Sequence, residues 1–365
     1  MDKTITALGL MSGTSMDGID ASILRSDGEK SIDIIGNFYI KYDHELKNKL
    51  RTLCNKISSK EDLNYNKKEY DDLERIITIK HSKIVSKITE KFKIKPQIIG
   101  FHGQTILHKP NENYSIQMGN AKLLFQLTNT KIIYEFRKND LDNGGEGAPL
   151  TPIYHHNLKK KLKIKKPVLF LNIGGIANYT YSKNNFFCAK DIGPGNCLMD
   201  LYIKKVKNLE FDKNGKIAAL GKVDNSLINY ILENEFYNTK KKYSLDIKDF
   251  DINFVKGLSV ENALANLNYL SAKLIYEKIK EEIDEDYIIL LCGGGRKNQT
   301  LVLNLKKFFK QVIYNIDDYK IDGDHIESQA FAYLSIRSLY KKNITFPETT
   351  RVRNPITGGQ LIKSN

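Results

Sequence analysis

Short, apolar, β-rich runs that end at glycine turns constrain the fold of this chain more than any other feature of its sequence. They occupy residues 5–10, 97–101, 168–173 and 287–292, and are followed closely by SGTSMDG, HGQT, GGIAN and GGGRKN. A run of this kind predicts a buried strand that enters a tight turn. The pattern occurs early in the chain and again near its middle, as expected of two related halves.

Long amphipathic segments lie between these runs. Apolar residues recur at i, i+3 and i+4 across residues 72–92 and 260–283, and residues 326–340 show a similar stripe. This spacing predicts helices with one apolar face, the second of them with Ser259 as its N-cap. Strands that alternate with long helices indicate an α/β fold.

The chain of 365 residues is long enough for two domains, each with its own core. Hydrophobic residues make up 41% and charged residues 27%, which excludes a disordered chain and collagen-like or disulfide-stapled scaffolds. The basic run LKKKLKIKK at residues 158–166 is interpreted as a solvated linker or helix end, in the neighbourhood of a domain hinge.

The net charge of +14 does not by itself indicate a polyanionic partner. Only eight of the basic residues are arginine, and the lysines are scattered beside many Asn and Ile residues. A nucleic-acid partner requires charge gathered on an element that reads a groove or follows the phosphates. We therefore expect no specific nucleic-acid partner. A polyanion-binding function would instead show a steeply salt-dependent affinity for nucleic acid.

The cysteines and the apolar segments indicate the compartment. The four cysteines have neither CxxC spacing nor clustered histidines, which argues against a zinc site and a disulfide framework. The amino terminus has too short an apolar core for a secretory signal, and no run approaches 18 apolar residues. We expect a soluble, reduced, cytoplasmic protein with no membrane partner.

The glycine turns also indicate a ligand. Backbone N–H groups at a glycine can approach an anion closely, and ligands of open α/β sheets bind beyond the carboxyl ends of the strands. Four such turns together predict a phosphate-bearing ligand held between two domains. The motifs GxGxxG after a first strand and GxxxxGK[ST] are absent, which removes the main support for Rossmann and P-loop folds.

The first turn, residues 12–20, concentrates hydroxyls, glycines and two carboxylates. Hydroxyls and backbone amides suit phosphate oxygens, and a carboxylate there can hold Mg²⁺ through water. The alternative is a simple hairpin with residues 19–24 as its second strand. The two interpretations are compatible, because the tip of a hairpin can hold a phosphate.

Further polar candidates lie after the predicted strand at 97–101 and before the turn at 192–195. Gln104 and Thr105 are typical hydrogen-bonding residues for a hydroxylated ligand, whereas His102 fits a base and a structural histidine equally well. Asp191 precedes an Ile-Gly-Pro-Gly turn, which suits a positioned base, but a turn-capping Asp is equally consistent with the sequence. Asp200 is expected on the surface of the following helix. His108 and the pair at 155–156 are interpreted as structural.

Six motifs in this order resemble the 1,6-anhydro-N-acetylmuramic acid kinase family. They are MSGTSMDGID, IGFHGQTILHKP, GGEGAPLTPIYHH, LNIGGIAN, DIGPGNCLMD and LCGGGRKN, and the resemblance runs from about residue 5 to residue 340. It implies the fold of actin/hexokinase/Hsp70-like ATPases, with two ribonuclease-H-like lobes and ATP in the cleft between them. We expect residues 1–134 plus 341–365 in the N-terminal lobe and residues 135–340 in the C-terminal lobe. The family is typically dimeric, so the resemblance also implies a homodimer.

The resemblance implies a double reaction. Water attacks the anomeric carbon of 1,6-anhydro-N-acetylmuramic acid and opens the anhydro bridge, while the freed O6 takes the γ-phosphate of ATP. The products are N-acetylmuramic acid 6-phosphate and ADP, and the process is the recycling of cell-wall peptidoglycan. ATP and Mg²⁺ are the implied cofactors, and the anhydro-amino-sugar is the small-molecule partner.

The family's functional residues carry over by motif match. Asp191 matches the catalytic base, and Asp17 is the candidate for water-mediated Mg²⁺ binding. Gln104, Asp140 and Asn178 are expected to face the sugar, and Arg137 to bind its lactyl carboxylate. The expected ATP-binding residues are Gly13, Thr14, Ser15, Met16, Asp17, Gly18, Ile19, Asp20, Gly174, Gly175, Gly293, Gly294 and Gly295.

Two departures from the family pattern leave other functions open. Glu135 stands where the family usually has Asp, and residues 243–250 only loosely represent a stretch that is usually more basic. One alternative is a related small-molecule kinase in which an Asp deprotonates a substrate hydroxyl directly. The other is a nucleotide-binding regulator or chaperone-like ATPase without sugar turnover.

Overall fold

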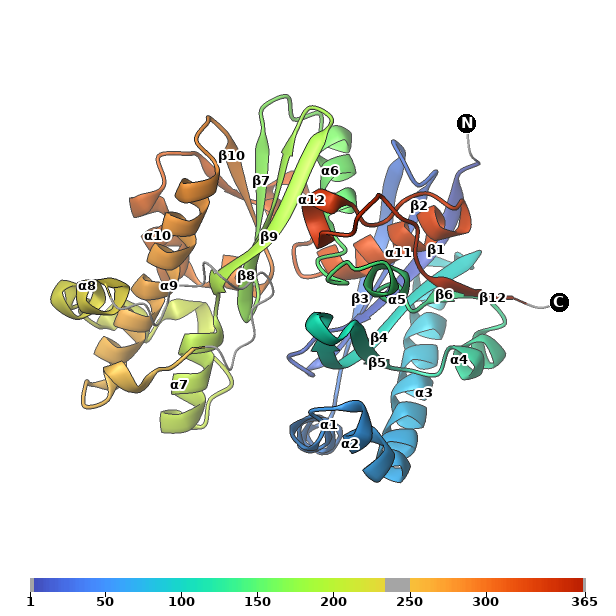
Figure 1. The fold of residues 1–365 in the computed structure, drawn as a ribbon, viewed down its shortest axis with the longest axis horizontal. Helices are drawn as coiled ribbons and strands as arrows, with labels where there is room; N and C mark the ends of the chain where they lie inside the picture. The colour runs from blue at the N-terminus through green and yellow to red at the C-terminus, as the bar shows by residue number, and fades with distance from the viewer. Residues whose placement is uncertain (1–2, 234–249, 364–365) are drawn as a thin grey trace. The chain divides into compact units, whose positions relative to one another are not determined.

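A computed structural model describes residues 3–233 and 250–363 and divides the chain between two units (Figure 1). Unit 1 comprises Met1–Lys163 and His325–Asn365, and unit 2 comprises Ile164–Asp324. Each unit is a mixed β-sheet with helices packed on it, so the predicted α/β class is confirmed.

Among the described residues, the sheet of unit 1 has the strand order β12-β6-β4-β1-β2-β3, with β5 paired to β4. The first three strands form an antiparallel meander, and β4 and β6 continue the sheet parallel to β1. The strands are β1 (Ile5–Ser12), β2 (Gly18–Ser26), β3 (Ile32–Lys41), β4 (Ile98–Lys109), β5 (Tyr114–Met118), β6 (Lys131–Tyr134) and β12 (Gln360–Ile362).

The sheet of unit 2 repeats this topology. Its described strands follow the order β11-β10-β7-β8-β9, in which β7, β8 and β9 form the meander and β10 and β11 run parallel to β7. They are β7 (Val168–Ile173), β8 (Ile176–Lys183), β9 (Phe186–Pro194), β10 (Ile288–Cys292) and β11 (Ile313–Asn315). A meander continued by two strands parallel to its first is the ribonuclease-H-like arrangement. The expectation of two such lobes is therefore confirmed.

The helices confirm the predicted stripes. The segments expected at 72–92, 260–283 and 326–340 form α3, α9 and α11, and the Ser259 side chain accepts a hydrogen bond from the backbone N–H of Asn262 as an N-cap. The α-helices of unit 1 are α1 (His44–Lys56), α2 (Lys60–Tyr65), α3 (Lys67–Phe92), α4 (Ala121–Thr128), α5 (Lys138–Asp142), α6 (Pro152–Lys161), α11 (Ile326–Leu339) and α12 (Pro347–Thr350). Those of unit 2 are α7 (Cys197–Lys207), α8 (Asn225–Glu233), α9 (Val260–Glu282) and α10 (Gln299–Phe308).

Alternating residues of β1 face two different helical layers. Leu8 and Leu10 are fully buried in one core cluster with residues of α1 and α3. Gly9, between them, points the opposite way, because successive strand residues face opposite sides of a sheet. A side chain at Gly9 would meet the backbone of α11, which packs on β1, β2 and β4.

The contact between α11 and the sheet depends on two paired glycines. Gly9 of β1 lies opposite Gly100 of β4 in the parallel register. A Cβ atom at Gly9 would lie 1.9 Å from the carbonyl oxygen of Ser328, and one at Gly100 would lie 2.2 Å from that of Phe331. Only glycine therefore allows the helix backbone to approach the sheet this closely.

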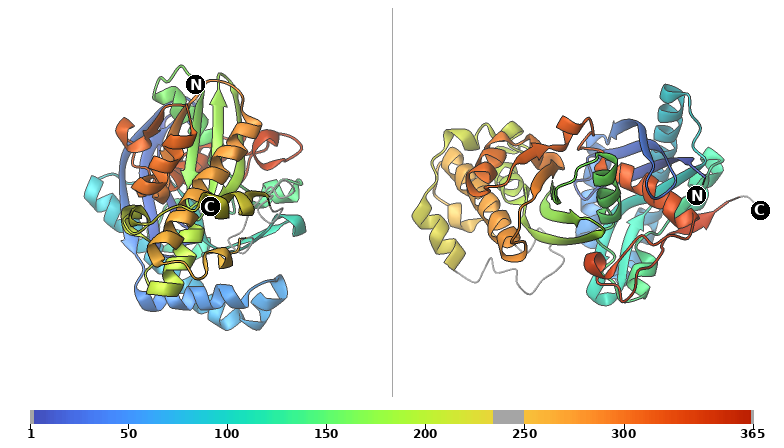
Figure 2. Two further views of the ribbon diagram at one scale, coloured as in Figure 1. Left: turned by 90° about the vertical axis from the view of Figure 1, so that its left-hand side faces the viewer. Right: turned by 90° about the horizontal axis from the view of Figure 1, so that it is seen from above.

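In unit 2, one face of the sheet packs on α7, α9 and α10. The fully buried residues Leu169 and Leu198 belong to the same apolar cluster as the inward face of α9. In Figure 2 the orange helices α9 and α10 lie against the green strands of this sheet. The loops at the carboxyl ends of β7 and β10 are the predicted glycine turns.

The unit boundaries differ from those expected from the sequence. Residues 135–163 and 325–340 belong to unit 1, although they were expected in the second lobe. The reason is α11, which packs on the sheet of unit 1 and is contacted there by α6. The first boundary between the units, at residues 163 and 164, falls within the basic run 158–166, and the hinge there stays a prediction. Residues 243–249 of the departing stretch lie outside the described residues.

No helix in the described part of the chain is long and apolar enough to span a membrane.

Replacing Gly9 with Ala tests the seating of α11. The new methyl group collides with a backbone carbonyl, so we expect the free energy of unfolding to fall by at least about 3 kcal/mol. Gly13→Ala is the control, because a Cβ there has only Ser15 Oγ near it, at 3.8 Å. That variant should change the free energy by less than about 1 kcal/mol. Urea unfolding measures both, and equal values would contradict the packing described.

Candidate active site

The turn between β1 and β2 is fixed from inside unit 1 by buried polar side chains. Ser12 Oγ lies 2.6 Å from Gln104 Oε1, 3.0 Å from the Tyr42 hydroxyl and 2.9 Å from the carbonyl oxygen of Gly18. Gln104 Nε2 donates to the carbonyl oxygen of Gly13 at 2.9 Å. Gln104 is fully buried, so its amide positions the turn from below.

The outer side of the same turn is polar and exposed. Thr14, Ser15 and Asp17 are exposed, and Ser15 Oγ donates to Asp17 Oδ1 at 2.7 Å. Met16 has a left-handed backbone with a φ of 52°, and its side chain is buried in the core together with Ile19. The hairpin interpretation is confirmed. Of the residues expected to bind ATP in this turn, Thr14, Ser15 and Asp17 are exposed, whereas Met16, Gly18 and Ile19 are buried.

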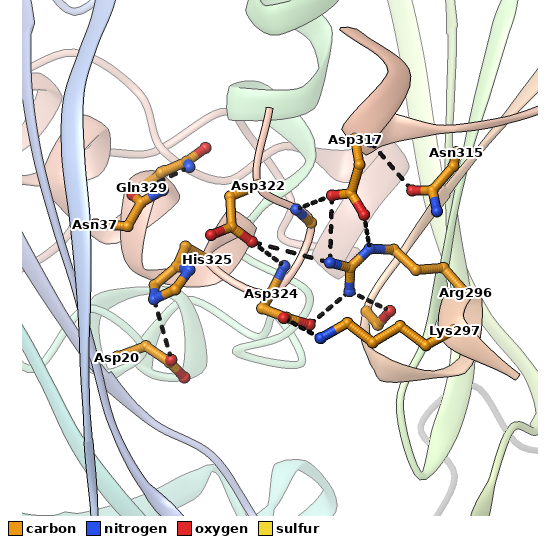
Figure 3. Close-up of polar contacts among 12 residues, drawn as sticks. Asp20, Asn37, Arg296, Lys297, Asn315, Asp317, Asp322, Asp324, His325 and Gln329 are labelled. Atoms are coloured by element: carbon orange, nitrogen blue, oxygen red, sulfur yellow. Dashed lines mark hydrogen bonds and ion pairs between the residues drawn. The ribbon is translucent and has the colours of Figure 1, made fainter. Parts of the chain in front are cut away.

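Two residues at the start of α11, His325 and Glu327, interact with candidate site residues of unit 1. His325 Nε2 lies 3.6 Å from Asp20 Oδ1, as Figure 3 shows. Burial raises the pKa of the Glu327 carboxyl, and the positive charge of Arg137 opposes that shift. Neither residue is predicted from the sequence, because the apolar stripe of the helix does not indicate its polar residues. The sequence feature that could identify them is a group of polar residues at the start of a helix that follows a DGD loop.

Arg137 is held in place by a neutral histidine. Its Nη2 and Nε atoms lie 2.9 and 3.2 Å from His102 Nε2, and Nη1 donates to the carbonyl oxygen of Gly147 at 2.7 Å. Burial, with a further contribution from Arg137, holds the pKa of His102 well below its usual value. His102 Nδ1 lies 2.9 Å from the Gly103 carbonyl oxygen, so Nδ1 carries the hydrogen and Nε2 accepts. The structural interpretation of His102 is thereby favoured.

Asp140 is buried and bonded within unit 1. Its Oδ2 accepts from the backbone N–H of Gly147 at 2.7 Å, and its Oδ1 accepts from Thr350 Oγ1 at 2.7 Å. The side chain was expected to face the sugar. Its observed contacts instead fix the loop that carries one of the acceptors of Arg137.

In unit 2, three polar residues stand in one row across the sheet. Asn172 of β7 pairs with Asn178 of β8, which pairs with Asp191 of β9. Residues directly opposite one another share a face of the sheet. All three are half-buried, and the register shifts between Ala177 and Asn178 so that Ile192 is the extra, bulged residue. A bulge at this point re-aims the neighbouring side chains, as is common beside active sites.

The Gly174–Gly175 turn and the turn after β9 are hydrogen-bonded to each other. The N–H groups of Gly195 and Cys197 donate to the Gly175 carbonyl oxygen at 2.9 and 3.1 Å. That of Asn196 donates to the Gly174 carbonyl oxygen at 2.8 Å. These contacts join the end of Asp191's strand and the start of α7 to the glycine pair, so the two turns form one rigid edge.

The third glycine turn of the candidate site is clamped by Arg296, as Figure 3 shows. This guanidinium is almost fully buried; it donates to the Gly293 carbonyl oxygen at 2.9 Å and pairs with Asp317 at 2.9 Å and Asp324 at 2.5 Å. Lys297 pairs with the other oxygen of Asp324. Arg296 therefore ties the turn to the loop that precedes α11, a role that was not predicted from the sequence.

The clamped turn leaves one backbone position open. A Cβ atom at Gly294 would meet nothing within 4 Å, whereas one at Gly295 would lie 2.3 Å from the Ile173 side chain. Gly294 is exposed and Gly295 buried. The space beside Gly294 is the kind of opening in which a ligand can approach the backbone.

Asp200 differs from the expected helix-surface carboxylate. It lies in the first turn of α7 and is half-buried. Burial, with smaller contributions from Glu210 and Asp212, raises the pKa of its carboxyl to about 7. Unit 2 thus contains two half-buried carboxylates in different surroundings, Asp191 near the end of a strand and Asp200 in the first turn of a helix.

The described residues provide positioned hydrogen-bond donors and one candidate base. In the described ranges, no group of three or more His, Cys, Asp and Glu side chains is placed to hold a metal ion. Unit 1 contributes an exposed hydroxyl-rich turn and a fixed guanidinium. Unit 2 contributes two glycine turns and a half-buried Asp on a rigid strand end. Taken separately, the groups of each unit are of the kinds that bind phosphates and anions, and the half-buried Asp of unit 2 is a candidate base.

Comparison with known proteins gives consistent matches along the whole chain. The model of the family described as anhydro-N-acetylmuramic acid kinase matches residues 5–363. Proteins of that name from Pelagibacter ubique, Zymomonas mobilis and Rhizobium etli are 47%, 34% and 35% identical to the chain. The matches cover 100%, 97% and 99% of this chain and 100%, 99% and 99% of the respective relatives.

Two solved structures are similar at low identity. The activator of the 2-hydroxyisocaproyl-CoA dehydratase from Clostridium difficile is 12% identical with a TM-score of 0.45, over 93% of this chain and 100% of that one. A ROK family glucokinase from Streptomyces griseus is 10% identical with a TM-score of 0.42, over 90% and 99% of the two chains.

Proposed function

Because the chain belongs to the anhydro-N-acetylmuramic acid kinase family, we propose that it opens the anhydro ring of this sugar and phosphorylates it in one ATP-dependent reaction. The observation that carries the proposal is the place of Asp191 at the end of a bulged strand, in one row with Asn178 and Asn172 and next to the glycine edge. A base is most effective where the backbone fixes it.

The reaction balances with a single base. Water adds to C1, its proton passes to the Asp191 carboxylate, and the bond between C1 and O6 breaks with its electron pair going to O6. O6 then attacks the γ-phosphorus of ATP, and the bond to the β-phosphate oxygen breaks, releasing ADP. Phosphorus accepts the leaving oxygen, so no separate acid has to protonate it. The product is N-acetylmuramic acid 6-phosphate.

Arg137 is the proposed contact for the lactyl carboxylate of the sugar. A guanidinium recognises a carboxylate through parallel N–H groups in a fixed plane. His102 and the Gly147 carbonyl oxygen hold that plane. Because His102 is neutral, it adds no charge of its own to the site. Asn178 is a further candidate contact, while Gln104 and Asp140 act by positioning.

The glycine turns are the proposed ATP site. Backbone N–H groups of the 13–18 turn, the Gly174–Gly175 turn and the turn at Gly294 bind the phosphates in this proposal. The carboxylate of Asp17 is exposed and offers oxygen ligands, the kind that Mg²⁺ prefers, directly or through water. Bound Mg²⁺ supplies neutralisation of the phosphate charge. The backbone N–H groups of these turns would orient the γ-phosphate of ATP toward O6.

The substrate places the enzyme in peptidoglycan recycling, since muramic acid is a cell-wall sugar. A cytoplasmic location and a homodimer belong to the same proposal. The net charge of +14 favours the approach of two anionic substrates.

An isotope experiment tests the ring-opening step. The purified protein turns over ATP and the anhydro-sugar in ¹⁸O-water, and we expect one ¹⁸O atom at C1 of the 6-phosphate and none in its ester oxygen. Unlabelled product kept in ¹⁸O-water under the same conditions corrects for exchange at C1. Phosphorylation of plain N-acetylmuramic acid with a comparable kcat/KM would favour direct transfer to a hydroxyl and refute the proposal.

The Asp191→Asn variant tests the base. Loss of proton transfer should lower kcat by about 10²- to 10⁴-fold while the Kd for ATP stays within about two-fold. Asp286→Asn is the control for the same change of charge. Asp286 precedes β10, at the end opposite the glycine turn, and pairs with Lys166 on the surface. A kcat near the wild-type value in Asp191→Asn would show that another group is the base.

Gly294→Ala tests the placement of the phosphates. The methyl group enters open space, so the free energy of unfolding should stay within about 1 kcal/mol. A phosphate close to this backbone would be displaced, and the KM for ATP should rise about ten-fold or more with little change in the KM for the sugar. Steady-state kinetics and thermal unfolding measure the two effects. An unchanged KM for ATP would remove Gly294 from the site.

A further inference from the structure

The carboxyl-terminal segment, residues 345–362, lies along the segment that carries Arg137. Its β12 pairs antiparallel with β6, immediately before Arg137, and Asn139 Nδ2 donates to the carbonyl oxygen of Thr357 at 2.5 Å. We call residues 345–362 the C-terminal strap. We propose that the strap positions Arg137 for the substrate through Thr350 and Asp140, which makes Thr350 a positioning residue of the reaction.

A continuous chain of hydrogen bonds joins Thr350 to Arg137. Thr350 Oγ1 donates to Asp140 Oδ1 at 2.7 Å, and Asp140 Oδ2 accepts from the N–H of Gly147 at 2.7 Å. The carbonyl oxygen of Gly147 in turn accepts from Arg137 Nη1 at 2.7 Å. Thr350 and Asp140 are 0% and 1% exposed. The two hydrogen bonds of Asp140 are therefore buried, where a hydrogen bond constrains geometry most strongly, and the one from Arg137 is partly buried.

The loop between Asp140 and Gly147 is held from both sides. The N–H of Glu146 donates to the Thr350 carbonyl oxygen at 2.7 Å, and that of Gly145 donates to the Asp140 carbonyl oxygen at 2.9 Å. A Cβ atom at Gly145 would lie 2.2 Å from Asp140 Oδ2, so the loop and the carboxylate are in close contact. If the carboxylate shifts, Gly147 shifts with it, and the guanidinium loses one of its acceptors.

The strap also contains a natural control. Thr345, at its start, is fully buried like Thr350, and its backbone bridges to Ile356 and closes the strap into a loop. Its hydroxyl differs from that of Thr350, because Thr345 Oγ1 has no hydrogen-bond partner among the described residues. Two buried threonines of one segment therefore differ in whether the hydroxyl reaches Asp140.

The inference rests on the proposed function, because it assigns Arg137 to the sugar. The two can fail separately. If the wild-type protein does not phosphorylate the anhydro-sugar, the proposed function fails. The strap can also be tested without an activity assay, by hydrogen exchange at the N–H of Gly147, which donates to Asp140 Oδ2.

The experiment compares Thr350→Val, Thr350→Ser and Thr345→Val in the full chain. Thr350→Val removes only the hydroxyl, so we expect the KM for the anhydro-sugar to rise about ten-fold or more, as is typical when a supporting hydrogen bond is lost. The KM for ATP should stay within about two-fold, and exchange at Gly147 should accelerate. Thr350→Ser keeps the hydroxyl and should restore the sugar KM to within about three-fold. Thr345→Val should match the wild type in both KM values.

Two results would overturn the proposal. One is an equal rise of both KM values in Thr350→Val, which indicates general loosening of unit 1. The other is a KM for the sugar that is the same in Thr350→Val and in Thr345→Val. Should Thr350→Val not fold, Asn139→Ala detaches the strap at Thr357 and must show the same selective rise of the sugar KM. An unchanged sugar KM in that variant contradicts the proposal equally.

Discussion

The close approach of α11 to the sheet of unit 1 is the constraint on which the rest of that unit depends. Gly9 and Gly100 lie side by side and leave room for the helix backbone where any Cβ atom would collide. The residues of this helix follow the whole of unit 2 in the sequence. Its first residues consequently reach the predicted ligand region, where His325 lies near Asp20 and Glu327 interacts with Arg137. One packing contact thus completes the core and delivers polar groups to the candidate site.

Burial explains the observed contacts of two polar residues that the motifs assign to the ligand. A polar group that is buried has to be hydrogen-bonded, since leaving it unpaired costs about 1–3 kcal/mol. Gln104 and Asp140 satisfy this demand by holding the 13–18 turn and the loop up to Gly147. Gln104 and Asp140 are residue types that often contact ligands. Here, as in a ligand site, they donate or accept hydrogen bonds in fixed directions. The difference is that the partners are backbone groups and buried side chains of the protein itself.

The features that the sequence predicts correctly are local. The strands that precede glycine turns and the stripes of α3, α9 and α11 follow from spacing within one segment, and the structure confirms them. The unit boundaries and the roles of Arg296 and Thr350 depend on partners distant in the sequence. Thr350 contacts a residue 210 positions away, which no periodicity encodes. Motifs therefore locate the candidate site, while tertiary contacts decide which of its members are exposed to a ligand.

The departure at Glu135 illustrates the same distinction. The family usually has Asp at this position, which suggests a carboxylate moved by one methylene within the site. In the structure Glu135 is exposed and has a left-handed backbone with a φ of 53°. Asp is better suited to that conformation, because its short side chain can hydrogen-bond locally, whereas Glu bears more of a backbone cost of about 1–2 kcal/mol. The turn it forms leads directly into Phe136, buried in the core, and Arg137. The difference therefore acts first on the backbone that presents the guanidinium of Arg137, the proposed contact of the sugar's carboxylate.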